Sequence, residues 1–211
     1  IQKESQSSRR KIVVWEVFVD SGGLGHELLN YDNVEVCVFS KEDGWDFDQI
    51  HIIEEFVEKM RSERPDHVWF APPCKKWSQI QELNIAQGQE EILMADGRRL
   101  EATHLRVTRE GYDEQQKNGR DAYVEHPTQS LMWRNYLMMN MRGYDATLDQ
   151  CAYGLRIWKN GVLLGPAKKQ TRIRTTNYHF AIGISKKCKC APRPDGCLLY
   201  TSDAADEGSS V

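Results

Sequence analysis

The chain of 211 residues lacks long hydrophobic runs, a cysteine-rich framework and low-complexity tracts. No apolar stretch approaches the roughly 18 residues that a membrane-spanning helix needs, and no apolar core follows the basic N-terminal residues, as it would in a secretory signal peptide. Six cysteines are too few and too scattered for a disulfide scaffold. These absences predict an intracellular protein, in the nucleus or the cytoplasm, with no membrane partner.

The composition is that of an ordinary globular protein. Hydrophobic residues make up 40% and charged residues 28%, which is enough for one core. We expect a disordered segment over 1–10, one domain over 11–184, a basic cysteine-containing segment over 185–196 and a separate tail over 197–211. We expect this domain to be a monomer.

The tail over 197–211 resembles translated sequencing-library adaptor, and we interpret it as foreign to the gene. The alternative is a disordered acidic tail. It contains three acids, Asp203, Asp206 and Glu207, and no basic residue. Removing these from the 31 acids leaves 28, which balances the 28 lysines and arginines, so the body of the chain is neutral.

Acidic residues are absent from one long stretch, between Arg156 and Arg193. Ten basic residues lie in it: Arg156, Lys159, Lys168, Lys169, Arg172, Arg174, Lys186, Lys187, Lys189 and Arg193. A stretch of one sign favours contact with a polyanion such as a nucleic-acid backbone. The alternative is a solvated basic face.

Strand and helix patterns alternate along the chain. Short β-branched and aromatic runs predict strands over 11–19, 34–39, 67–71, 121–124, 144–152, 172–176 and 179–184. Helical spacing of apolar residues predicts helices over 49–64 and 130–141. The charged, Gln-rich segment 79–118 is interpreted as a helix with a loop. This order predicts an α/β, doubly wound, Rossmann-like fold, with a mostly parallel sheet, an antiparallel C-terminal strand and ligands beyond the carboxyl edge.

A glycine-rich turn follows the first predicted strand. Phe18 precedes Gly22, Gly23 and Gly25, whose missing side chains would let the backbone approach a nucleotide-like ligand. The spacing is not G-x-G-x-x-G and no Walker lysine follows, so a phosphate-binding loop is disfavoured. After the second strand, Asp46 is either a ligand-binding acid or a cap for the helix near residue 49.

Two further strand ends carry reactive side chains. Cys74 follows Pro72 and Pro73 and precedes two lysines, whose charge would lower the pKa of its thiol. Glu125 follows the strand over 121–124 and should face the same edge. A buried, inert cysteine is the alternative for Cys74.

Two features near the C-terminus complete the set of candidates. Arg172 and Arg174 lie in Gln170-Thr171-Arg172-Ile173-Arg174, and their guanidinium groups suit contacts with phosphate or bases. An exposed strand with its arginines in water is the alternative. The spacing of Cys188 and Cys190 is poor for zinc, so we expect no metal site.

In their order, these motifs resemble those of DNA cytosine-C5 methyltransferases over about residues 11–184, and are closer to the divergent domains of eukaryotic retroelements than to restriction-modification enzymes. The resemblance implies a fold and a cofactor, S-adenosylmethionine (SAM), which it assigns to Phe18, Gly22, Gly23, Gly25, Asp46 and Pro72. Glu42 is the nearest carboxylate to the family's ribose-binding acid.

The resemblance also implies a mechanism on DNA, with RNA as the alternative substrate. The thiolate of Cys74 would add to C6 of a flipped cytosine, Glu125 would bind N3, and Arg172 and Arg174 would contact substrate and phosphate. The family has Glu-Asn-Val where this chain has Glu125, His126 and Pro127, and its asparagine supports the cysteine loop. The other hypotheses are an inactive nucleic-acid-binding domain of a mobile element and a different SAM-dependent or nucleotide-binding enzyme.

Overall fold

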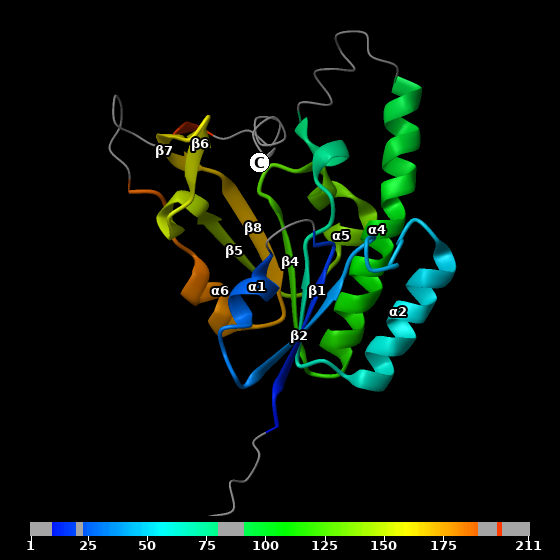
Figure 1. The fold of residues 1–211 in the computed structure, drawn as a ribbon. Helices are drawn as coiled ribbons and strands as arrows, with labels where there is room; N and C mark the ends of the chain where they lie inside the picture. The colour runs from blue at the N-terminus through cyan, green and yellow to red at the C-terminus, as the bar shows by residue number, and fades with distance from the viewer. Residues whose placement is uncertain (1–9, 20–22, 80–90, 190–197, 200–211) are drawn as a thin grey trace, which may run out of the picture.

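The structure, a computed structural model, describes residues 10–19, 23–79, 91–189 and 198–199 (Figure 1). Its strands are β1 Ile12–Val17, β2 Val34–Phe39, β3 His67–Phe70, β4 Asp121–Pro127, β5 Tyr144–Asp149, β6 Arg156–Lys159, β7 Val162–Lys168, β8 Gln170–Thr175 and β9 Leu198–Leu199. Its α-helices are α1 Leu24–Leu28, α2 Ile50–Glu63, α4 Glu91–Lys117, α5 Tyr136–Met139 and α6 Tyr178–Ile184. Three 3₁₀ turns are η1 Lys75–Trp77, η2 Leu131–Arg134 and η3 Gln150–Tyr153.

Six strands form the central sheet in the order β2-β1-β3-β4-β8-β5. Neighbouring pairs among β1 to β4 are parallel, whereas β8 runs antiparallel to both β4 and β5. Helices α2, α4 and α5 cover one face, and α1 and α6 cover the other (Figure 1). The prediction of a doubly wound, mostly parallel sheet with an antiparallel strand near the C-terminus is confirmed.

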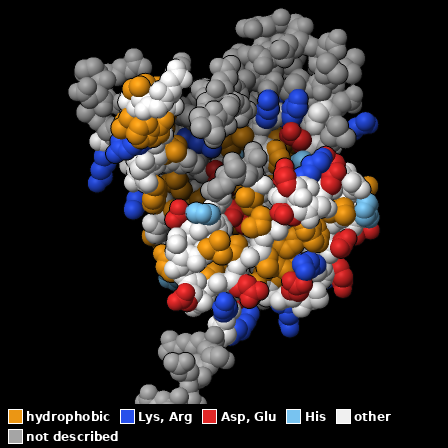
Figure 2. All heavy atoms as spheres, viewed as in Figure 1, with side chains coloured by type: hydrophobic (Ala, Val, Ile, Leu, Met, Phe, Trp, Pro, Cys, Tyr) orange, Lys and Arg blue, Asp and Glu red, His pale blue; other side chains and the backbone are white. Residues whose placement is uncertain are grey.

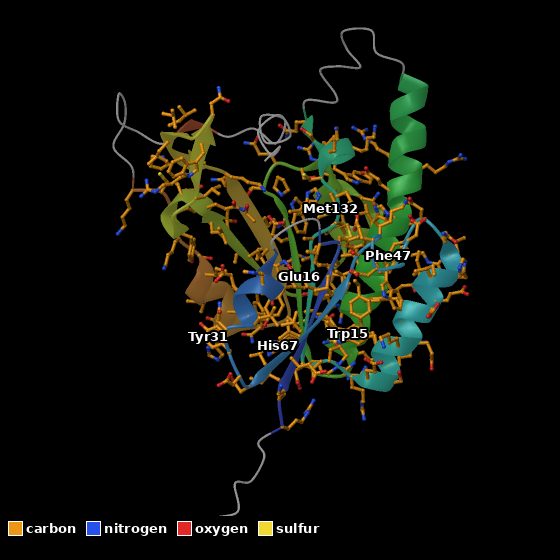
Figure 3. All side chains as sticks on the ribbon, viewed as in Figure 1. Trp15, Glu16, Tyr31, Phe47, His67 and Met132 are labelled. Atoms are coloured by element: carbon orange, nitrogen blue, oxygen red, sulfur yellow. The ribbon has the colours of Figure 1, made fainter. Side chains whose placement is uncertain are left out.

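The first strand shows why the sheet lies between two layers. Successive side chains of a strand point to opposite faces, so Trp15 points toward α2 while Glu16 points toward α1 (Figure 3). Trp15 is fully buried against Phe39 and Phe56, at ring-centroid distances of 4.5 and 5.7 Å. The apolar stripe of α2 packs on the same core through Ile53, Phe56, Val57 and Met60.

Two predicted elements differ in the structure. The final predicted strand, 179–184, is helix α6, because Asn177 caps it by accepting the Phe180 amide at 2.9 Å and its apolar residues follow helical spacing onto β5 and β8. The predicted helix over 130–141 is broken into η2 and α5, because Asn135 has extended backbone and caps the second segment.

Strands β6 and β7 form an antiparallel hairpin that the sequence patterns did not predict. It lies between η3 and β8, and β9 pairs with its second strand at Ala167 and Lys168. Most of the expected N-terminal segment and adaptor-like tail lie outside the described residues, as does Gly22. No helix in the described part of the chain is long and apolar enough to cross a membrane.

Candidate active site

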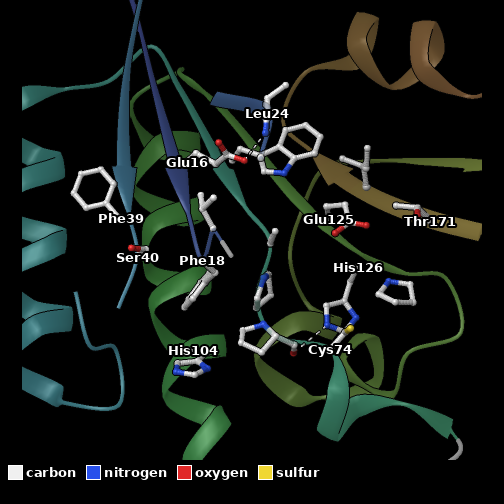
Figure 4. Close-up of a pocket in the computed structure, with 18 of the residues that line it drawn as sticks. Glu16, Phe18, Leu24, Phe39, Ser40, Cys74, His104, Glu125, His126 and Thr171 are labelled. Carbon is white, nitrogen blue, oxygen red and sulfur yellow. Dashed lines mark hydrogen bonds between the residues drawn. The ribbon is translucent and has the colours of Figure 1, made fainter. Parts of the chain in front are cut away.

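A cleft of about 1000 Å³ opens at the carboxyl ends of the parallel strands (Figure 4). Its walls come from the segments that follow β1, β2, β3 and β4, and from β8 and η3. Ligands of doubly wound sheets bind at this edge, because the loops there diverge to either side of the sheet. The predicted residues Phe18, Gly23, Asp46, Pro72, Cys74 and Glu125 all line it.

The turn between β1 and α1 is closed by Glu16. Its buried carboxylate accepts the amide N–H groups of Leu24 at 2.7 Å and Gly25 at 2.5 Å. A Cβ on Gly23 would lie 2.2 Å from the Glu16 carboxylate, and one on Gly25 would lie 2.8 Å from it. A side chain at either position would displace the Glu16 carboxylate from these two hydrogen bonds.

Gly25 differs from its predicted role in binding a cofactor. It is buried in α1 rather than among the residues that line the cleft, and a Cβ there would also lie 2.9 Å from the Val36 side chain. Its missing side chain serves the packing of α1 on β2 and on Glu16.

Aromatic rings form one end of the cleft. Phe18 has a φ of 65°, a conformation that bulky residues rarely adopt, and its ring lies between Phe47 and His104. The ring-centroid distances are 5.1 Å to Phe47 and 5.3 Å to His104. This end of the cleft therefore presents aromatic side chains that are tilted relative to one another.

Asp46 lies in the cleft and does not cap α2, whose N-cap residue is Gln49 and whose first turn has no side-chain cap hydrogen bond. It lines the cleft, and it also accepts the Gln49 side-chain amide at 3.1 Å and pairs with Lys41 at 3.0 Å. The hydrogen bond from Gln49, followed by that from Lys41, lowers the pKa of Asp46. The carboxylate is therefore anionic and already anchored to the loop before α2.

The Cys74 loop is fixed on both sides of the cysteine. Pro72 is buried, and the Cys74 carbonyl accepts the Trp77 amide at 3.1 Å, which starts η1. The Ser130 hydroxyl then donates to the Trp77 carbonyl at 3.2 Å. Cys74 itself is half-buried and lines the cleft, so its thiol is both held and accessible.

His126, on β4, supports the same loop through a contact with Pro73. It is fully buried, and its Nε2 lies 3.4 Å from the Pro73 carbonyl, which can only accept (Figure 4). Burial lowers the pKa of His126 to about 4, so the ring is neutral and Nε2 carries the proton. The histidine thus supports the loop that carries Cys74.

Glu125 lies on the other face of β4 from His126 and points into the cleft. Burial raises the pKa of Glu125, against the opposing effects of the Lys169 charge and a hydrogen bond from Thr171. The carboxyl group therefore keeps its proton to a higher pH than an exposed glutamate. A protonated carboxyl beside a thiol can donate a hydrogen bond to a bound ring nitrogen.

Arg172 and Arg174 are placed apart from this cluster. Both point to the opposite face of β8, where they pair with Asp145 at 2.7 and 2.5 Å. Arg172 also stacks over Trp133 at 4.4 Å. Neither belongs to the residues that line the cleft, whose β8 members are Thr171 and Ile173. In this arrangement the alternate residues of β8, rather than its arginines, face Glu125.

Four residues in or near the cleft were assigned no role there by motif analysis. Lys169 and Thr171 act on Glu125, while His104 and Glu101 lie on α4. His104 pairs with Asp48 at 3.0 Å, and its Nδ1 has no partner among the described residues. No motif surrounds His104 and Glu101, and their spacing of one helical turn was the only available signal for them. Lys169 and Thr171 lie within the basic stretch and the Gln170–Arg174 motif, which pointed to the arginines instead.

Glu101 should make stability depend on pH. Burial raises the pKa of Glu101 from about 4.5 to about 7, so the folded state favours the protonated carboxyl. The stability that the protonated Glu101 contributes is therefore lost as pH rises from about 4.5 toward 7. Glu101→Gln should therefore melt about 2–4 °C above the wild type at about pH 8 and equal it at about pH 4. Thermal melts at both values test this, with the exposed Glu55→Gln as control; equal differences at both would contradict it.

The strand order and the cleft at the carboxyl edge define a doubly wound, Rossmann-like α/β domain. No protein-family model matches the chain, and no curated protein matches it. Among solved structures, the methyltransferase EhMeth of Entamoeba histolytica is similar over 79% of this chain and 53% of that one, with 11% identity and a TM-score of 0.42. The chain thus spans about half the length of that protein. A likeness this low carries no argument about activity.

Proposed function

We propose that the chain is a SAM-dependent methyltransferase that acts on C5 of cytosine in DNA. The observation that carries the proposal is the presence of Cys74 and Glu125 in one cleft, beside the glycine turn and the aromatic wall of its other end. A thiol nucleophile and a buried carboxyl at adjacent strand ends are the two groups that this reaction requires.

The charges at the aromatic end suit SAM better than a phosphorylated nucleotide. Glu16, Glu42, Asp46 and Asp48 line this end, and the one lysine among them, Lys41, pairs with Asp46 and Asp48. SAM carries a sulfonium and an ammonium group and no phosphate, so an acidic lining favours it. Phe18 would contact the adenine, and the open backbone at Gly23 would lie at the methionine end.

The residues of the other end would carry the chemistry. The Cys74 thiolate adds to C6 of cytosine and forms a C–S bond, while Glu125 gives its proton to N3. SAM, when bound, supplies the methyl group that C5 takes up. The C5 proton then leaves to solvent, the C6–S bond breaks to restore the thiolate, and the N3 proton returns to Glu125.

The test is the identity of the product. Protein incubated with duplex DNA and methyl-labelled SAM should yield 5-methylcytosine after digestion to nucleosides and mass spectrometry. Cys37→Ala removes a half-buried cysteine outside the cleft and should behave as the wild type. Label on an exocyclic amine, or on no base, would contradict the proposal.

One observation favours the second candidate, an inactive domain that binds nucleic acid. Arg172 and Arg174, which the resemblance assigns to the substrate, pair with Asp145 and do not line the cleft. Among the described residues, Lys75 and Lys169 are then the cations that line the substrate end of the cleft. That candidate predicts DNA binding with no uptake of SAM in calorimetry and no labelled product.

A further inference from the structure

The β6–β7 hairpin exposes large apolar side chains that no described residue covers. The side chains of Trp158 and Val162 are each 60% exposed, and those of Leu163 and Leu164 are 44% and 48% exposed. Trp158 and Leu163 are paired across the hairpin and so share one face, while their neighbours in β7 point to the other. Strand β9 pairs only with the base of the hairpin, at Ala167 and Lys168, so the part that carries these side chains is a two-stranded ribbon. Such a ribbon is marginally stable in water, and we expect a binding partner to cover it.

The hairpin is attached directly to the wall of the cleft. It starts after η3, whose Gln150 and Tyr153 line the cleft, and it ends at Lys168. The next residue, Lys169, lines the cleft, and its charge acts on Glu125. The Leu155 carbonyl accepts the Ala167 amide at 2.9 Å, which ties the base of the hairpin together. In Figure 1 it rises beside the carboxyl edge of the sheet, across from η1.

Its surroundings are basic. From residue 150 to residue 189 the chain has no acidic residue and nine lysines or arginines. Arg156 is exposed on β6, Lys168 is half-buried on β7, and Lys186 lies 4.5 Å from the ring of Tyr153. Figure 2 shows hydrophobic side chains over the hairpin with lysine and arginine side chains beside them.

We propose that the β6–β7 hairpin is a DNA-binding element that holds the duplex over the cleft, with Trp158 stacking on or inserting beside the bases next to the target. A two-stranded ribbon fits the width of a major groove, and aromatic side chains stack on unpaired bases or part a base step. The one-sign charge around the hairpin complements the phosphate backbone and disfavours a basic or neutral protein partner. This inference rests on the proposed action on DNA.

Binding of a fluorescent DNA duplex, followed by anisotropy over a range of salt, tests the proposal. Trp158→Ala should weaken binding by about 10- to 100-fold, with unchanged affinity for SAM. Arg156→Gln combined with Lys168→Gln should reduce the salt slope by about 2. The matched controls are Tyr136→Ala, which removes a 75% exposed aromatic on α5, and Lys117→Gln at the far end of α4. Both should bind DNA as the wild type does.

Wild-type affinity in Trp158→Ala would overturn the proposal. A change of oligomeric state in Trp158→Ala with DNA affinity intact would also overturn it and would assign the hairpin to contacts between proteins. A loss of affinity for an RNA duplex but not for DNA in the same variant would overturn it as well. Trp158-dependent DNA binding without any 5-methylcytosine would leave the hairpin assigned and contradict the proposed reaction. Normal formation of 5-methylcytosine with DNA binding unchanged in Trp158→Ala would support the proposed reaction and contradict the role of the hairpin.

Discussion

Replacing Cys74 with alanine is expected to lower the rate of cytosine methylation by a factor on the order of 10⁴ or more. The thiolate is the only group in the proposed reaction that can saturate the C5–C6 bond and make C5 nucleophilic, so its loss leaves no alternative route. Cys74 lines the cleft without contributing to the buried core, and the loop is held by contacts of Pro73 and Trp77. The variant should therefore remain folded.

The measurement is single-turnover transfer of label from SAM to DNA, paired with calorimetry of SAM binding. We expect the affinity for SAM to stay within about threefold, because the cofactor end of the cleft is formed by other residues. Cys151→Ala is a control in a thiol outside the cleft. Substantial methylation by Cys74→Ala would assign the chemistry to another group.

Replacing Trp15 with alanine is expected to destabilise the domain by about 3–5 kcal/mol and to lower the melting temperature by about 10 °C or more. Trp15 is fully buried at the centre of the aromatic core, between the rings of Phe39 and Phe56. Its indole N–H has no acceptor among the described residues, so the loss is one of packing and of the cavity left behind.

The chain offers a matched control for this change. Trp158→Ala makes the same substitution at a side chain that is 60% exposed, where the expected change in stability is within about 0.5 kcal/mol. Urea denaturation of both variants provides the comparison. Equal losses of stability in the two variants would contradict the assignment of Trp15 to the centre of the core.

The parts of the fold that were predicted correctly depend on local patterns. Apolar β-branched runs predicted β1 and β2, and a regular apolar stripe predicted α2. The same patterns placed Cys74 and Glu125 just after β3 and near the end of β4, so their shared cleft followed from the parallel arrangement.

The parts that were missed depend on contacts between elements. In β8 either set of alternate residues could face the cleft, and packing against Trp133 and Asp145 turned the arginines to the other side. The apolar run at Phe180 suits a strand or a helix, and the capping side chain of Asn177 decided for the helix. His126 could not be assigned to loop support without the Pro73 contact.

The central claim is that Cys74 forms a covalent bond to cytosine in this cleft. The most direct measurement is mass spectrometry of peptides after incubation with SAM and DNA that contains 5-fluorocytosine, because the fluorine cannot leave C5 and the C6–S bond then persists. The account predicts an adduct on the peptide that contains Cys74, dependent on SAM and reduced in Glu125→Gln. No adduct, or one on Cys37, Cys151 or Cys188 instead, would contradict it.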